Sequence, residues 1–192
     1  MRHQGQLNSW RRQADQQVKS ENWQAATVLY KKALAVDSSA GFARDGLAQA
    51  SARQKLNAQF DHYLAKPDRI YSPEPLANAR QLLSTASTAA NSAPATELPT
   101  EPKLAGKIEA LQQLVVQAGT PVPVVLYSDG HTEVAIYHVG RLGRFEQKIV
   151  SLRPGDYTVT GSRAGFRDVR RILKLRPGEN VPPLLIRCEE PV

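Results

Sequence analysis

Cysteine is nearly absent from this chain, which has 192 residues and a single cysteine, Cys188. One cysteine cannot form a disulfide within the chain, and it excludes a metal site built from several cysteines. A lone cysteine near the end of an apolar run is typical of a small buried hydrophobic residue. We therefore expect Cys188 to be buried rather than reactive.

Long apolar runs are also missing. A helix that crosses a membrane needs about 20 consecutive apolar residues, and the apolar stretches of this sequence are far shorter. The first ten residues are polar, with no apolar stretch behind Arg2, so we expect neither a signal peptide nor a transmembrane segment. Apolar residues nevertheless make up 41% of the chain, which is enough for a packed core and argues against wholesale disorder.

Residue patterns that announce catalysis are absent. The four histidines form no His-Glu-x-x-His motif, and the Gly161-x-x-x-Gly165 pair lacks the Lys-Ser/Thr of a phosphate-binding loop. The acidic residues are scattered, and no sequence context brings two of them into one cleft. We therefore predict a protein that is not an enzyme, with no catalytic residues, no cofactor and no metal site.

Runs of like charge are missing too, although the net charge is +7. The excess of Lys and Arg is shared between the first and the last third of the chain, which favours a solvated basic surface over a dedicated nucleic-acid tail. Aromatic residues, at 6% of the chain, are few for a protein that stacks bases. We therefore do not expect nucleic acid as a partner.

Helical spacing characterises the sequence up to about residue 118. Apolar side chains recur every three to four positions in residues 23–34, in residues 40–65 and in residues 104–118. The Ser-Pro-Glu sequence at residues 72–74 is typical of a helix start, with a hydroxyl cap followed by a proline. Between these helices, residues 84–102 are rich in Ser, Thr, Ala and Pro, and we expect a surface loop or linker there.

From about Gly119 the spacing changes to that of strands. Apolar residues alternate with a period of two, β-branched residues become more frequent, and turns with Gly or Pro recur. We predict short strands at about residues 122–127, 132–139, 145–152, 156–162, 167–175 and 183–188, with one of the turns at residues 140–143. Such strands form a meander or a sandwich. The predicted fold class is α+β, with N-terminal α-helical hairpins and a C-terminal antiparallel β-sandwich.

A set of small and aromatic residues at fixed spacing marks the first two helices: Trp10, Ala14, Trp23, Ala26, Tyr30, Ala33 and Leu34. In this set the chain resembles a tetratricopeptide repeat, a helix pair of about 34 residues. Glu21 stands where the turn of that family usually has glycine, and the following helix matches a second repeat only weakly. The resemblance implies stacked helices with a concave groove that binds a peptide or protein partner.

A second set of motifs lies in the strand region. A Leu-Arg-Pro-Gly turn leads into a strand at residues 152–159, a Gly-Phe pair follows at residues 165–166, and another Leu-Arg-Pro-Gly occurs at residues 175–178. In these motifs the region is similar to a PEGA-type β-domain, a small β-sandwich module of bacterial surface and envelope proteins. The resemblances divide the chain into a tetratricopeptide-like segment (residues 1–90), a linker with an amphipathic helix (residues 91–118) and a PEGA-like β-domain (residues 119–192).

The register of the repeat resemblance implies which residues line the groove. They are polar or aromatic and come from two helices: Asn8, Arg11, Asp15, Lys19, Phe42, Asp45, Gln49 and Arg53. Arg and Lys beside Asn are suited to hold a carboxylate of a partner peptide. Simple solvation of a polar helix face explains the same residues.

The β-domain carries its own basic cluster: Arg163, Arg167, Arg170, Arg171 and Lys174. Charges on an edge strand commonly block strand-to-strand aggregation. The functional alternative is contact with an anionic glycan, a lipid head group, nucleic acid or an acidic partner, and the scarcity of aromatic residues makes nucleic acid the weakest of these.

Two functions follow from these observations. The first is a non-enzymatic scaffold or adaptor that binds a peptide or protein through the helical groove. The alternative is a module that binds an anionic glycan or lipid surface through the basic β-domain. The resemblance to envelope-associated scaffold proteins implies the bacterial cell envelope, on the periplasmic side if the chain is part of a longer anchored protein, and a cytoplasmic location stays open.

Overall fold

The computed structural model describes residues 2–91 and 101–192. The chain forms two compact units. The helical unit comprises the residues up to Pro67 together with Asn78–Gln113, and the β-unit comprises Asp68–Ala77 together with Leu114–Val192. These units have boundaries at other places than residues 90 and 118. The predicted three-part division of the chain stays a prediction.

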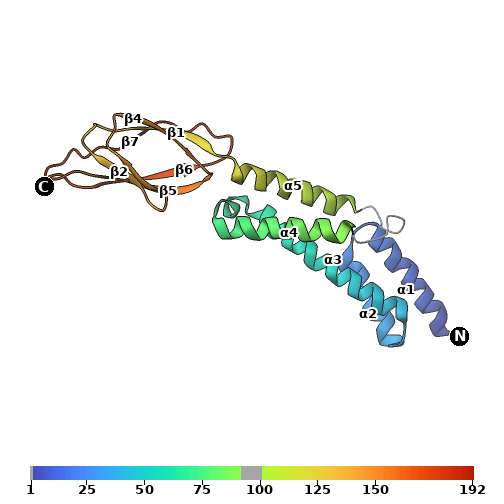
Figure 1. Cartoon of the computed structure of the whole chain (residues 1–192). Helices are drawn as coiled ribbons and strands as arrows, with labels where there is room; N and C mark the ends of the chain where they lie inside the picture. Colours follow the sequence, from blue (N-terminus) through green and yellow to red (C-terminus); the bar gives the residue numbers. More distant parts are fainter. Residues whose placement is uncertain (1, 92–100) are drawn as a thin grey trace. The chain divides into compact units, whose positions relative to one another are not determined.

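Helices occupy the N-terminal part, as predicted (Figure 1). They are α1 (Arg2–Lys19), α2 (Trp23–Val36), α3 (Gly41–Ala65), the 3₁₀-helix η1 (Pro67–Tyr71), α4 (Pro73–Asn91) and α5 (Pro102–Gly119). Within the helical unit α1 packs on α2, α2 packs on α3, and α1 also touches α3. Among the described residues, no helix has the length and apolar character needed to cross a bilayer.

The predicted loop at residues 84–102 is wrong in its first part, because α4 continues to Asn91. Ser and Thr normally compete with the helix by bonding to the backbone locally. Here the hydroxyl groups donate backward within the helix, from Thr85 to the carbonyl oxygen of Gln81 (2.9 Å) and from Ser87 to that of Leu83 (3.0 Å). The central part of the predicted loop, residues 92–100, lies outside the described residues.

Small residues build the core of the helical unit. The buried set is dominated by alanine: Ala14, Trp23, Ala26, Tyr30, Ala33, Ala40, Ala43 and Ala50. The predicted stripe on α2 is thus confirmed as core. Tyr30 lies against Gly46 of α3, where a β-carbon would overlap the tyrosine ring. Glycine at this position therefore allows α2 to lie close to α3.

Two sheets form the β-unit. Their strands are β1 (Val122–Tyr127), β2 (Glu133–Ile136), β3 (Gly140–Gly143), β4 (Gln147–Leu152), β5 (Gly155–Ser162), β6 (Val169–Leu175) and β7 (Leu184–Leu185). The strand orders are β4-β1-β7 and β3-β2-β5-β6. All pairs are antiparallel except β1 with β7.

The two sheets share one core, which makes the unit a sandwich. Its buried residues alternate along the strands, as the period of two predicts: Val124, Leu126, Val134, Ile136, Leu152, Val159, Leu173, Leu175 and Ile186. Cys188 is buried and has a free thiol, as expected. The turn predicted at residues 140–143 is wrong, because these residues form β3.

The turn that precedes β3 lies three residues earlier in the chain. It is made by Tyr137, His138 and Val139, and the N–H of Val139 donates to the carbonyl oxygen of Ile136 (3.0 Å). His138 takes a positive φ of 60°, which histidine adopts more readily than most other non-glycine residues. A turn without glycine or proline at its centre lacks the usual sequence signal.

A compact hydrogen-bond network closes the β1–β2 loop. The carboxylate of Asp129 accepts bonds from the N–H groups of His131 (2.9 Å) and Thr132 (2.7 Å) and from the Thr132 hydroxyl (3.1 Å). That hydroxyl is fully buried and accepts from the N–H of Cys188 (3.1 Å). Burial raises the pKa of Asp129, but the hydrogen bonds outweigh it and lower the pKa to about 2.

The contact between Tyr30 and Gly46 predicts the effect of adding one methyl group. We expect Gly46→Ala to lower the free energy of unfolding by about 1–3 kcal/mol, because the ring has to move from its packed position. Gly106→Ala is the matched control, since Gly106 is also helical and has nothing within 4 Å of a β-carbon. It should raise stability by about 0.5–1 kcal/mol. Urea unfolding measures the free energy of unfolding of both variants. Equal changes in Gly46→Ala and Gly106→Ala would contradict the close contact between Tyr30 and Gly46.

Asp129 predicts a pH dependence of stability. Its pKa is near 2 when folded, against 3.8 as the ordinary value, so its contribution is full above pH 4 and disappears as the pH falls toward 2. We expect Asp129→Asn to cost about 1–2 kcal/mol at pH 7 and almost nothing at pH 2. Asp168→Asn, an exposed carboxylate of the same unit, is the control. If the free energies of unfolding of the wild type and of Asp129→Asn differ by the same amount at all pH values, the hydrogen-bond network of Asp129 does not stabilise the fold as described.

Candidate functional site

The predicted groove residues lie on two helix faces that border each other in the helical unit. The residues contributed by α1 recur at helical spacing and are exposed: Asn8, Arg11, Asp15 and Lys19. Those contributed by α3 have the same spacing: Phe42, Asp45, Gln49 and Arg53. Phe42 and Arg53 are half-buried and the others are exposed. Residues spaced in this way share one side of a helix.

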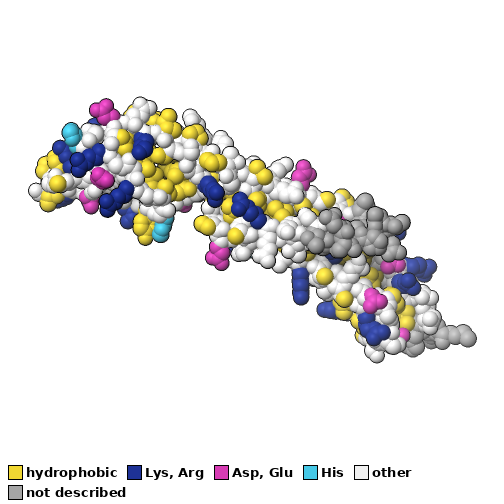
Figure 2. Space-filling model, viewed as in Figure 1, with side chains coloured by type: hydrophobic (Ala, Val, Ile, Leu, Met, Phe, Trp, Pro, Cys, Tyr) yellow, Lys and Arg dark blue, Asp and Glu magenta, His cyan; other side chains and the backbone are white. Residues whose placement is uncertain are grey.

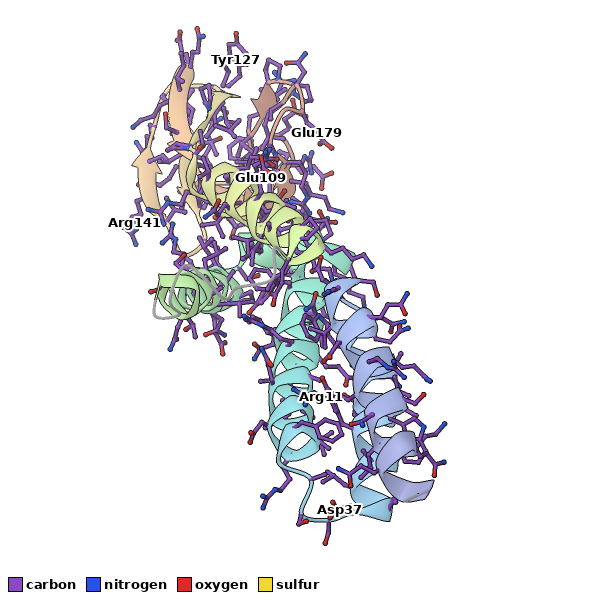
Figure 3. The ribbon with its side chains drawn as sticks, turned by 90° about the vertical axis from the view of Figure 1, so that its right-hand side faces the viewer. Arg11, Asp37, Glu109, Tyr127, Arg141 and Glu179 are labelled. Atoms are coloured by element: carbon purple, nitrogen blue, oxygen red, sulfur yellow. The ribbon has the colours of Figure 1, made fainter. Side chains whose placement is uncertain are left out.

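Arg11 of α1 contacts a side chain of α3. Its guanidinium carbon lies 5.6 Å from the centre of the Phe42 ring, within the range of a cation–π contact. Figure 3 shows Arg11 between α1 and α3, and it shows Asp37 at the turn from α2 to α3. The structure therefore brings together one predicted residue from each helix.

Tyr30 adds a third helix to this place. Burial raises the pKa of its hydroxyl, the negative charge of Asp15 raises it further, and the positive charge of Arg11 opposes the rise. Both charges thus act on the phenol of Tyr30, a buried residue of α2. We name Arg11, Asp15, Tyr30 and Phe42 the groove centre.

Arg53 has a structural partner instead of a free guanidinium. Its Nε atom lies 3.0 Å from Oε1 of Glu101, just before α5, and the two side chains are 20% and 10% exposed. Burial raises the pKa of Glu101, and the charge of Arg53 acts in the opposite direction. Of the predicted groove residues, Arg53 is the one that forms an ion pair within the part of the chain that the structure describes.

Residues of the α1–α2 turn and of α3 hold α5 on the helical unit. The carboxylate of Glu21 accepts bonds from the N–H groups of Lys103 (2.7 Å) and Leu104 (3.0 Å). It thereby caps two backbone donors that no residue within a helix can satisfy. Lys107 extends the contact, since its ammonium group lies 2.8 Å from Asp61 and 3.0 Å from Asn57.

Tyr30 and Glu101 are the members of this region that sequence reasoning missed as contributors to the groove. Tyr30 belongs to the buried stripe and is 6% exposed, so its spacing in the sequence predicts core packing and not an interaction with the charges of Arg11 and Asp15. A signal existed in Gly46, because an isolated glycine in a helix lowers helix stability and often has a packing reason. Glu101 gave no such signal, since it is separated from Arg53 by 48 residues.

The members of the basic cluster of the β-domain differ in their partners, although Arg167, Arg170 and Arg171 line one hollow. Arg163 lies 3.6 Å from Asp129 and above the ring of Phe166, at 4.2 Å from its centre. Arg167 lies 3.4 Å from Glu190. The remaining members are Arg170, Arg171 and Lys174, and they belong to β6, an edge strand. They have no ion pair with the described part of the chain.

No arrangement for catalysis by a metal ion is found in residues 2–91 and 101–192, where no three His, Cys, Asp or Glu side chains are grouped to hold a metal. An open cleft of about 570 Å³ lies between α3 and α4 and is lined by His62, Tyr63 and mostly uncharged residues. Its ionisable lining residues are His62 and Tyr63, whose ring centres are 5.5 Å apart.

Comparison with known proteins does not assign this chain to a family. No protein-family model matches the sequence, and no curated protein matches it closely enough to be called a relative. The resemblances to a tetratricopeptide repeat and to a PEGA-type domain therefore stay predictions.

The pair of Arg53 and Glu101 predicts a stability effect at a residue first assigned to binding. We expect Arg53→Ala to lower the free energy of unfolding by about 1–2 kcal/mol, because the half-buried Glu101 carboxylate loses its partner. The double variant Arg53→Ala/Glu101→Ala should lose less than the sum of the two single variants. Urea unfolding gives all three values. Strict additivity would mean that the two side chains do not interact.

Proposed function

We propose that this chain is a non-enzymatic binding protein whose groove between α1 and α3 takes an extended segment of another protein. The observation that carries the proposal is the position of Arg11, which is exposed yet held against Phe42 and near Tyr30. A guanidinium ordered in this way has lost part of its side-chain freedom before the partner arrives, so less is lost on binding.

The groove centre supplies the contacts that peptide recognition needs. Arg11 presents planar donors that fit a carboxylate with two hydrogen bonds. The half-buried ring of Phe42 offers apolar area beside that charge, and aromatic and arginine side chains are frequent where binding energy concentrates. Asn8 and Lys19 extend the same face of α1 in both directions, and so lengthen the surface along which a peptide chain binds.

The wider role that we propose is that of a scaffold or adaptor of the bacterial cell envelope. The helical spacing and the small and aromatic residues of α1 and α2 support the tetratricopeptide-like reading, and the Pro-Gly turns of the β-unit support the PEGA-like one. In such an arrangement the helical unit binds the partner, and the β-unit is a second surface of the same molecule.

Peptide arrays test the groove directly. The full chain is applied to arrayed peptides that carry either a free C-terminal carboxylate or a C-terminal amide, together with internal Asp or Glu. We expect the carboxylate-bearing peptides to bind better, and we expect Arg11→Glu to weaken that binding by about tenfold or more. Phe42→Ala should weaken it as well, because the apolar contact beside the charge is lost.

Arg12→Glu is the matched control, because Arg12 is exposed, adjacent in sequence and on another face of α1. It changes the net charge by the same amount and should leave binding nearly unchanged. If Arg11→Glu and Arg12→Glu weaken binding equally, general charge rather than the groove explains it. If no carboxylate-bearing peptide is preferred, the proposal fails.

A further inference from the structure

The outer face of the four-stranded sheet carries a row of side chains that crosses all of its strands. Ala135 on β2 pairs with Arg141 on β3 at one side and with Thr160 on β5 at the other. Thr160 pairs in turn with Arg170 on β6. Directly paired residues point to the same face of a sheet, and the residues that alternate with Ala135 and Thr160 are buried in the core. The two arginines therefore lie on the outer face, one on each edge strand.

A second row lies beside the first. The N–H of Tyr137 donates to the carbonyl oxygen of Thr158 (2.9 Å), and Thr158 pairs with Ile172 of β6. Tyr137 is 68% exposed and Ile172 is 57% exposed. The Tyr137 ring lies 3.9 Å from the ring of His138, centre to centre. An open hollow of about 780 Å³ lies on this face, and its lining includes Tyr137, Arg141, Thr158, Thr160 and Arg170.

The positive charges of this face are not neutralised by the chain itself. Arg141 and Arg170 have no ion pair with residues that the structure describes. The acidic neighbours have other partners, because Asp156 lies 2.9 Å from Arg176 and Glu133 lies 3.6 Å from Arg144. Figure 2 shows Lys and Arg side chains over the β-strands with hydrophobic side chains between them.

We infer that this outer face binds an anionic polysaccharide, with the sugar chain lying across the strands between Arg141 and Arg170. Strands lie about 4.8 Å apart, so three steps place the two arginine backbones about 14 Å apart. Each guanidinium offers the planar donors that match a sugar carboxylate. Thr160 lies in the row between them and Thr158 in the next row. The Thr160 hydroxyl donates to the carbonyl oxygen of Ala135 (3.4 Å) and keeps its acceptor sites, while a threonine hydroxyl such as that of Thr158 both donates and accepts hydrogen bonds, as sugar hydroxyls require.

Charge density separates this ligand from nucleic acid. One strand of DNA carries a phosphate about every 3.4 Å, which is roughly four phosphates over the same 14 Å. The face offers two arginines separated by uncharged Ala and Thr, so about half of those phosphates would face no cation. Base stacking needs free aromatic rings, and the exposed ring of this face, Tyr137, already lies against His138.

The geometry also argues against a lipid surface. A flat bilayer makes contact with a protruding set of basic and apolar side chains, whereas Thr158 and Thr160 are half-buried and line a hollow that a flat surface does not enter. The inference goes beyond the peptide groove of the helical unit, since it uses another unit and another class of ligand.

Binding of the full chain to polygalacturonate at low salt tests the inference, with neutral dextran, a thymidine oligonucleotide and phosphatidylglycerol vesicles as comparison probes. We expect polygalacturonate to bind more tightly than the other three probes. Arg141→Gln/Arg170→Gln should weaken that binding by about tenfold or more, because both charge-assisted contacts are lost. Both side chains are exposed, so the fold should be unchanged in circular dichroism.

Arg167→Gln/Arg187→Gln is the matched control. It removes two charges from the same unit, and both arginines have acidic partners, Glu190 and Glu189. We expect the affinity of this control variant for polygalacturonate to change by less than about twofold. Equal losses in the two double variants would show attraction by net charge alone and would overturn the inference, as would absence of binding to polygalacturonate.

Two further outcomes are decisive. If the oligonucleotide or the vesicles bind more tightly than polygalacturonate and depend equally on Arg141 and Arg170, the face recognises another class of ligand and the inference is wrong. Arg11→Glu should bind polygalacturonate like the wild type, because Arg11 belongs to the helical unit. Failure of the peptide experiment and failure of the polysaccharide experiment are therefore distinguishable.

Discussion

The packing of Tyr30 on Gly46 determines what the helical unit can present to a partner. The ring occupies the space that any other side chain at position 46 would fill, and it thereby sets the distance between α2 and α3. The buried alanines Ala14 and Ala43 allow similarly close packing, and α1 is held near α3 as a result. Arg11 then reaches the Phe42 ring, and the charges of the groove act on the phenol of Tyr30. The proposed binding surface, made largely of polar residues, thus depends on a contact between Tyr30 and Gly46 in the interior of the unit.

The two candidate surfaces share one arrangement of side chains, which is built on helices in one unit and on strands in the other. In each, an arginine is exposed, forms no ion pair with the residues that the structure describes and lies near an aromatic or hydroxyl-bearing neighbour. In the helical unit the spacing of α1 and α3 brings these groups together, and in the β-unit the strand register does so. Rigid elements position such groups better than loops do. Neither surface requires a reactive group, and both fit a molecule that recognises partners by charge and shape.

Periodicity predicted the parts of this structure that repeat locally. The change from helical to alternating spacing near Gly119 marks the observed change from α5 to β1, and the stripe on α2 is buried as its spacing predicts. The errors arise where the outcome depends on a single backbone conformation or on a distant residue. His138 turns the chain at a positive φ without a glycine signal, so the sequence pattern placed that turn too late. Arg53 was assigned to the groove from the register of the repeat resemblance, and nothing near it in the sequence reveals Glu101. The placement of Arg141 and Arg170 at the two ends of one row across the sheet is visible only once the strand register is known.

The capping of α5 by Glu21 has a consequence for how the chain is made. The cap joins residues that are 82 positions apart, and ribosomes add about 5–20 residues per second. The α1–α2 turn therefore emerges roughly 4–16 seconds before the backbone donors that it will satisfy. Throughout that interval the nascent hairpin has an unfinished side, which α5 closes only near the end of translation of the helical unit.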